Sequence, residues 1–145
     1  MDLKSSLEVK AELNNLALIR DFVEETGVSL AADPVMLLDV VLAVNEIASN
    51  IMIHNYQGQP GLIEIDVGQA EDALVVRLRD EGPPFDPTTV PNPDLNLPLE
   101  KRPLGKMGIY LTRQLTDEMT HRLTSQGGNE LTLVKKGILG NPKID

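Results

Sequence analysis

The stretch that decides the fold runs from Asp33 to Tyr56 and reads DPVMLLDVVLAVNEIASNIMIHNY. An aspartate followed by a proline is a strong helix start, because Asp33 caps free N–H groups and Pro34 has no N–H to leave unpaired. The apolar residues that follow cover nearly the whole helix surface. The pattern therefore predicts one long central helix over 33–56.

Three polar residues interrupt this apolar helix at a regular spacing. Glu46, Asn50 and His54 are four positions apart, so they lie in line along one face of an α-helix. Polar groups that are buried without partners are costly. An acid, an amide and an imidazole in line on a buried helix therefore indicate a functional site.

The composition restricts the class of protein. The 145 residues fit a single domain over 1–145, and an apolar content of 41% is enough for a core. A net charge of −9 argues against direct binding of nucleic acid, because phosphate binding needs a basic face. The absence of cysteine excludes a disulfide framework and a thiolate metal site. No apolar run approaches the about 20 residues of a membrane span, and the N-terminus is unlike a signal peptide, so we expect a cytoplasmic protein without membrane contact.

The rest of the chain predicts five strands and two further helices. Strands are expected at 3–10, 62–67, 73–78, 119–125 and 131–136, and helices at 11–25, ending at Gly27, and at 109–117. This order favours an α/β (α+β) two-layer sandwich, in which helices cover one face of a mixed or antiparallel sheet. The Pro-rich stretch between strand and helix is too long for an ordinary loop and predicts a lid over about residues 87–104. The tail 137–145 is expected to be loose.

Three short segments carry a resemblance to a known family. They are Glu46-x-x-x-Asn50-x-x-x-His54-x-Tyr56, Asp80-x-Gly82-x-Pro84-Phe85-Asp86 and Gly105-x-x-Gly108-Ile109. In this order they resemble the three sequence boxes of the GHKL ATPases, the superfamily of gyrase B, MutL and the histidine kinases. The short length and the Pro-Phe-Asp-Pro form of the second box look most like the RsbW type of anti-sigma-factor serine kinase. The resemblance runs from about residue 5 to residue 136 and implies the histidine-kinase-like (Bergerat) fold, with ATP and Mg²⁺ as cofactors.

The resemblance assigns the first box to the metal and to the chemistry. Mg²⁺ prefers oxygen ligands and is held by few protein groups together with substrate phosphates, so the amide oxygen of Asn50 suits it as the metal ligand. The matching glutamate of the family is the catalytic base, which makes Glu46 the candidate here. The alternatives are an asparagine hydrogen-bonded in the core and a glutamate in a surface salt bridge. His54 is more easily read as a structural hydrogen-bonding residue.

The second box is implied to hold the base of the nucleotide. Asp80 ends a predicted strand, and a carboxylate there accepts a hydrogen bond from the amino group of adenine, which guanine lacks at that position. The alternative is an aspartate that caps its own turn. Gly82 allows the backbone to approach the base, and Phe85 forms one wall of the pocket.

The third box is implied to hold the phosphates. Its residues surround a helix start, where N–H groups and the helix dipole attract anions. The implied nucleotide-binding residues are Gly105, Lys106, Met107, Gly108 and Ile109, and the cations expected to supply a phosphate contact are Lys101, Arg102 and Lys106. The alternative is that these cations are solvated charges of the lid.

Two positions depart from the family pattern. Asn129 stands where the family often has a threonine that holds the base through water, and we keep Asn129 as a nucleotide-binding residue with a different geometry. The glycine box also lacks an extra glycine that many relatives carry. Neither change removes the base or the metal ligand.

The resemblance implies a Mg-ATP-dependent protein serine/threonine kinase. Its partners would be an anti-sigma-factor antagonist, which it phosphorylates, and a sigma factor, which it sequesters, so it would act in transcription regulation. ATP and ADP are the expected nucleotides, and a homodimer is the expected assembly. The alternative is a nucleotide-sensing partner switch with little or no phosphotransfer. ATP hydrolysis of the gyrase type and histidine kinase activity are less expected, because those proteins carry further domains. A cavity beside Asn50 that is too narrow for a nucleotide would contradict the interpretation.

Overall fold

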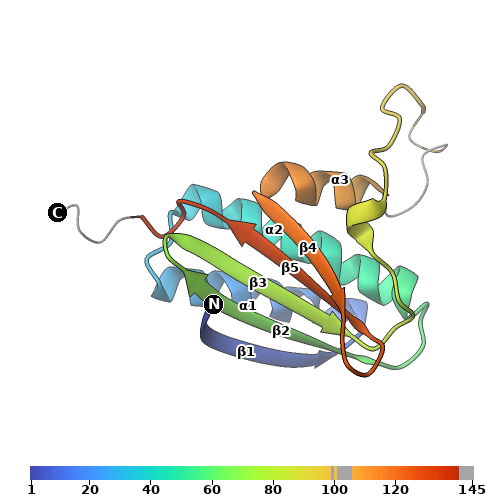
Figure 1. Ribbon diagram of the computed structural model, residues 1–145, viewed down its shortest axis with the longest axis horizontal. Helices are drawn as coiled ribbons and strands as arrows, with labels where there is room; N and C mark the ends of the chain where they lie inside the picture. Colours follow the sequence, from blue (N-terminus) through green and yellow to red (C-terminus); the bar gives the residue numbers. More distant parts are fainter. Residues whose placement is uncertain (99, 101–105, 141–145) are drawn as a thin grey trace.

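The computed structural model describes residues 1–98, 100 and 106–140, and it consists of one antiparallel sheet with helices on one face (Figure 1). The five strands lie in the order β1-β2-β3-β5-β4, and every neighbouring pair is antiparallel. The two-layer sandwich is confirmed, with the antiparallel form of the sheet. The elements are β1 (Asp2–Lys10), η1 (Leu13–Asn15), α1 (Leu16–Ser29), α2 (Pro34–Asn50), η2 (Ile51–Asn55), β2 (Leu62–Ala70), β3 (Ala73–Asp80), η3 (Pro87–Thr89), α3 (Lys106–Leu115), β4 (Glu118–Leu123) and β5 (Asn129–Lys135).

The predicted central helix is present, and it begins as the sequence indicated. The side chain of Asp33 accepts a hydrogen bond of 2.9 Å from the backbone N–H of Met36, and Pro34 is the first helical residue. The end of the helix differs from an ideal α-helix, because Ile51–Asn55 forms a π-helical turn. This extra width changes which side chains face the sheet at that end.

The helix Pro34–Asn55 is long and apolar enough, by length and composition alone, to cross a membrane. No apolar run of this length was expected from the sequence. In this fold the apolar character has a different cause, since α2 packs against the sheet and its inner side chains are almost fully buried. The core that it forms with β2, β3 and β5 includes Leu37, Val40, Val44, Ile47, Ile63, Ile65, Val67, Leu74, Val76, Leu78, Leu131 and Leu133.

The first helix does not end at Gly27 as predicted. It continues to Ser29, because Gly27 is a packing position rather than a terminator. A Cβ atom at Gly27 would lie 2.4 Å from the Cδ1 atom of Leu37 in α2, so only glycine allows the two helices to approach this closely. The turn is made later by Ala31, whose φ is +59°.

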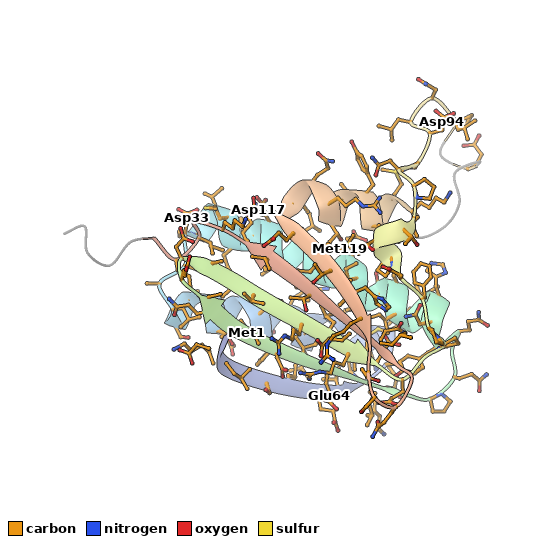
Figure 2. All side chains as sticks on the ribbon, viewed as in Figure 1. Met1, Asp33, Glu64, Asp94, Asp117 and Met119 are labelled. Carbon is orange, nitrogen blue, oxygen red and sulfur yellow. The ribbon has the colours of Figure 1, made fainter. Side chains whose placement is uncertain are left out.

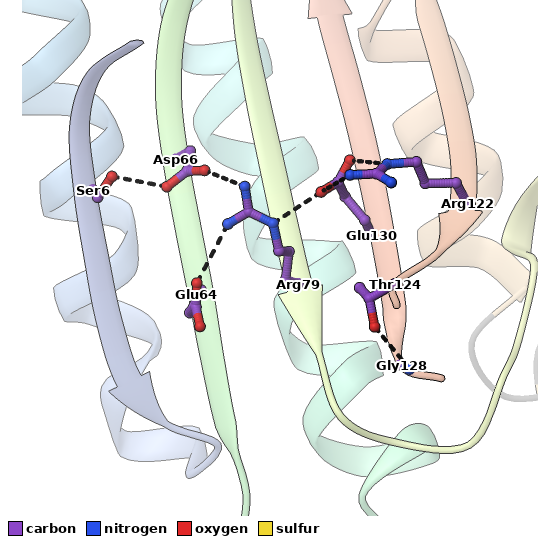
Figure 3. A network of polar contacts seen from close by, with 8 residues as sticks. All are labelled: Ser6, Glu64, Asp66, Arg79, Arg122, Thr124, Gly128 and Glu130. Carbon is purple, nitrogen blue, oxygen red and sulfur yellow. Dashed lines mark hydrogen bonds and ion pairs between the residues drawn. The ribbon is translucent and has the colours of Figure 1, made fainter. Parts of the chain in front are cut away.

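The sheet face that points away from the helices carries a polar chain across all five strands (Figure 3). Arg79 in β3 is its centre and contacts Asp66 in β2 at 2.6 Å and Glu130 in β5 at 2.8 Å. Ser6 in β1 donates to Asp66 at 2.8 Å, and Arg122 in β4 contacts Glu130 at 2.7 Å. Each strand therefore contributes at least one side chain to a continuous series of hydrogen bonds, and β2 also contributes Glu64, 3.3 Å from Arg79.

Residues after the last strand are not all loose. Ile138 is 1% exposed, its carbonyl accepts from the N–H of Asp33 at 2.8 Å, and the N–H of Leu139 donates to Asp72 at 3.0 Å. The expected loose tail therefore does not include Ile138 and Leu139, which fasten the chain beside the start of α2. Residues 141–145 lie outside the described part.

Candidate functional site

A small cavity lies between the second half of α2, the end of β3 and the start of α3. It holds about 30 Å³, which is room for one or two water molecules. Predicted site residues from all three sequence boxes meet there. The lining residues are Ile47, Asn50, Ile51, Asn55, Asp80, Phe85, Pro87, Ile109, His121, Asn129 and Leu131.

Glu46 and Asn50 lie together beside the first turn of α3. A Cβ atom at Gly108 would be 3.0 Å from Oε2 of Glu46 and 3.3 Å from Nδ2 of Asn50. Gly108 is buried inside the helix rather than in a turn before it, since α3 begins at Lys106. The missing side chain leaves the backbone of α3 open toward the carboxylate and the amide, so the first and third boxes form one site.

Asp80 is the last residue of β3, as expected, and the residue is only 3% exposed. Oδ1 accepts from the N–H of Gly82 at 2.9 Å and from Nδ2 of Asn129 at 3.1 Å, and Oδ2 accepts from Nδ2 of Asn55 at 3.4 Å. Burial raises the pKa of Asp80, although these hydrogen bonds and the nearby His121 act in the opposite direction. Because Oδ2 accepts only one long hydrogen bond, this buried carboxylate can accept a further hydrogen bond from a ligand.

Asn129 lies at the centre of the cavity wall and links four segments. Besides Asp80, it donates to the carbonyl of Pro83 at 3.0 Å, and its Oδ1 accepts from the N–H of Phe85 at 2.9 Å. Nε2 of His121, in β4, lies 2.8 Å from the same Oδ1 and therefore acts as the donor. Asn129 thus holds Asp80 and the beginning of the lid in place, which a threonine is too short to do in the same way.

The first part of the expected lid is attached to α3. Arg113 donates to the carbonyls of Pro87, Thr88 and Val90 and, at 2.9 Å, to Oδ1 of Asn92. Beyond this anchored stretch the chain projects away from the sheet and the helices, with Asp94 on the projecting part (Figure 2). Phe85 and Pro87 therefore close one side of the cavity and give it its small volume.

Residues 9–135 match the model of the histidine kinase-like ATPase domain family. The chain belongs to this family. The match extends over all the lining residues of the cavity.

The ATPase domain is also similar to named proteins. The serine-protein kinases RsbW of Bacillus mycoides (strain KBAB4) and Bacillus cereus (strain G9842) are each 33% identical to it over 85 residues, covering 56% of this chain and 53% of the relative. The chain thus spans about half the length of these curated relatives. The crystal structure of the RsbU and RsbW domains of Rv1364c from Mycobacterium tuberculosis shares the fold, with a TM-score of 0.63 and 19% identity over 92% of this chain and 32% of that chain.

Most predicted site residues of the ATPase domain are near one another, and several are outside the described part. Lys101, Arg102 and Gly105 lie outside the described residues. Lys106 and Met107 occupy the first turn of α3, partly exposed, and Ile109 lines the cavity. Among the described residues, no group of three or more His, Asp or Glu side chains is arranged to hold a metal ion.

Two polar residues of the cavity, Asn55 and His121, were not found from the sequence. His54 is not a lining residue of the cavity, whereas Asn55, the last residue of the π turn, is. His121 and Met119 are two positions apart in β4 and therefore point to the same, inner face of the sheet. A histidine that shares a strand face with an apolar residue was the signal in the sequence that could have identified it. Both residues contact the Asp80–Asn129 pair.

The expected open cavity beside Asn50 is not observed. A purine ring is larger than one or two water molecules, so the cavity as it stands is too small to enclose one. The polar groups are nevertheless arranged for a nucleotide: a carboxylate acceptor at one end, and at the other an amide and a carboxylate beside the open backbone of Gly108.

Proposed function

We propose that this protein is a Mg-ATP-dependent protein serine/threonine kinase and anti-sigma regulatory factor. It phosphorylates an anti-sigma-factor antagonist and sequesters a sigma factor. The observation that carries the proposal is the position of Glu46 and Asn50 together beside Gly108, at the start of the helix expected to hold phosphates. The similarity to serine-protein kinases named RsbW supports the choice of reaction.

Each residue has a separate part in the proposed reaction. Asp80 accepts a hydrogen bond from the amino group of adenine, and the first turn of α3 with Lys106 faces the phosphates. The amide oxygen of Asn50 holds Mg²⁺, which neutralises phosphate charge. Glu46 accepts the proton of the serine or threonine hydroxyl as its oxygen bonds to the γ-phosphorus and ADP leaves. Phosphoryl transfer depends mainly on such alignment and charge stabilisation, and the half-buried carboxylate of Glu46 next to the proposed metal ligand meets both needs.

The experiment is phosphate transfer from labelled ATP to a candidate antagonist. Asn50→Ala should lose Mg-ATP binding, whereas Glu46→Gln should retain the nucleotide and lose transfer. Gln114→Ala, on the exposed side of α3, is a matched control that should behave as the wild type. Unchanged Mg-ATP affinity in Asn50→Ala, measured by calorimetry, would refute the metal assignment. Tight ATP binding without any labelled partner would instead identify a nucleotide-sensing partner switch.

The remaining parts of the proposal concern assembly and surroundings. We propose a homodimer that works in the cytoplasm, does not contact nucleic acid directly and exchanges ATP for ADP. A net charge of −9 favours partners with a basic docking face and speeds their association at low salt. Light scattering at the mass of a single chain would contradict the dimer. Replacement of ATP by GTP should abolish binding if Asp80 reads the base.

A further inference from the structure

The π turn at the end of α2 places Asn55 next to the carboxylate expected to read the base. The N–H of Tyr56 donates to the carbonyl of Ile51 at 3.0 Å, five positions back, which is the bond that defines this wider turn. As a result Asn55 lines the cavity, and its Nδ2 lies 3.4 Å from Oδ2 of Asp80. Such turns are rare inside helices and occur frequently at functional sites.

The environment fixes the position of Asn55 from two sides. The hydroxyl of Tyr56 donates to the carbonyl of Leu62 at 2.6 Å and accepts from the N–H of Glu81 at 2.7 Å. On the other side, a Cβ atom at Gly82 would lie 3.0 Å from the Cβ of Asn55. The backbone at 55 is therefore held between β2 and the segment that follows Asp80, and the carboxamide is positioned before any ligand arrives.

The chemistry of the carboxamide adds a donor next to an acceptor. The NH₂ group has two N–H donors, and only one of them is needed for the contact with Asp80. The other oxygen of Asp80 already accepts from Gly82 and Asn129, which leaves Oδ2 and the second N–H of Asn55 side by side at the cavity. Adenine presents the complementary pattern, an amino donor beside a ring-nitrogen acceptor, whereas guanine presents a carbonyl oxygen where adenine has the amino group.

We propose that Asn55 is a specificity-determining residue of the nucleotide site. It donates a hydrogen bond to one of the two ring nitrogens on either side of the adenine amino group, N1 or N7, while Asp80 accepts from the amino group itself. The inference rests on the proposed function, because it requires that adenine occupies this cavity. Recognition of the adenine ring then depends on the π turn, which brings Asn55 to the cavity in place of His54, the residue that regular helical spacing would select.

The test compares ATP with 1-deaza-ATP and 7-deaza-ATP, two analogues that each lack one of the ring nitrogens, N1 and N7, that lie on either side of the amino group. In the wild type, one analogue should bind about tenfold more weakly than ATP, the loss expected for a single hydrogen bond. Asn55→Ala should bind ATP about tenfold more weakly and should no longer distinguish ATP from that analogue. His54→Ala, the neighbouring residue outside the cavity lining, is the matched control and should leave all three affinities unchanged.

The outcomes separate this inference from the proposed function. A wild type that binds no ATP overturns both. A wild type that binds ATP, together with an Asn55→Ala variant of equal ATP affinity or undiminished discrimination, overturns only the role of Asn55. If Asn55→Ala does not fold, as judged by circular dichroism, the affinities of the wild type for ATP and the two analogues provide the test. Equal affinity for all three nucleotides overturns the inference.

Discussion

Gly108 in α3 is packed against Glu46 in α2, and a Cβ atom at position 108 would lie 3.0 Å from the carboxylate oxygen Oε2. This contact joins the candidate base to the helix expected to hold the phosphates. It also means that the distance between α2 and α3 is set by the absence of a side chain. Any larger residue must displace either Glu46 or Asn50, whose Nδ2 would be 3.3 Å away.

The first prediction follows from this contact. Gly108→Ala should lower the rate of phosphotransfer by about tenfold or more, because small displacements of catalytic groups are costly. Stability should change by less than about 1 kcal/mol, since alanine favours the helix while the contact opposes it. Single-turnover kinetics and urea unfolding measure the two effects. Transfer at the wild-type rate would show that the spacing at Gly108 does not matter for the chemistry.

The second prediction concerns pH. Burial raises the pKa of Asp80 above its ordinary value of 3.8, so the native protein binds this proton more tightly than the unfolded chain. The stabilising contribution of this group is therefore present below its ordinary pKa and is lost as the pH rises through the raised pKa. The free energy of unfolding of the wild type, relative to Asp80→Asn, should fall as the pH rises from below the ordinary pKa of 3.8 through the raised pKa. Urea unfolding of both proteins at several pH values measures it, and a constant difference would contradict the burial of this charge.

The third prediction concerns the polar chain on the outer sheet face (Figure 3). Arg79→Ala leaves the 5% exposed side chain of Glu130 and the 11% exposed side chain of Asp66 without their central cation. Unfolding should be easier by about 2–3 kcal/mol, somewhat less than for a fully buried pair, because the side chain of Arg79 is 28% exposed. Denaturant unfolding tests this, with Arg77→Ala on the same face of β3 as the control. A loss no larger than that of Arg77→Ala would show that the chain across the strands is not stabilising.

The same network predicts the acid behaviour of Glu130. Burial disfavours its charged form, but hydrogen bonds and charge from Arg122 and Arg79 outweigh burial, and the pKa is lowered from its ordinary value of 4.5. The stabilisation is therefore present above that value and is lost as the pH falls through the lowered pKa. Glu130→Gln should remove this part of the acid dependence, which acid titration of the unfolding free energy detects.

The last prediction concerns the beginning of the lid. Arg113 supplies hydrogen bonds to three carbonyls between Pro87 and Val90, so Arg113→Ala should release this stretch from α3. Amide hydrogen exchange at Thr89 and Val90 should become at least about tenfold faster, because local opening no longer breaks these bonds. Arg113→Lys keeps the charge but not the planar fork, and it should give an intermediate rate. Exchange as slow as in the wild type would show that the turn Asp86–Val90 is stable without the hydrogen bonds from Arg113.

The sequence predicted the frame of the site and only part of its detail. Glu46, Asn50 and Asp80 were selected by helix spacing, by the end of an apolar strand and by the resemblance to the family's sequence boxes, and the structure places Asn50 and Asp80 at one cavity with Glu46 beside Gly108. Asn55 was missed since the π turn follows from a choice of backbone hydrogen bond that no local spacing reveals. His121 was missed since its role arises from Asn129 on the neighbouring strand. The closed cavity was also not foreseen, because it depends on how Phe85 and Pro87 are held by distant residues.

The amino-acid sequence by itself determined the central helix with its Asp33 cap, the alternating strands and the family, since each of these is fixed by interactions between residues near one another in the chain. Only the tertiary structure decided that Gly108 meets Glu46, that Asn55 rather than His54 faces Asp80, and that Arg79 in β3 links β2 to β5. These relationships connect residues far apart in the chain or depend on the exact width of one helical turn. Packing selects them, and a linear pattern does not contain that information.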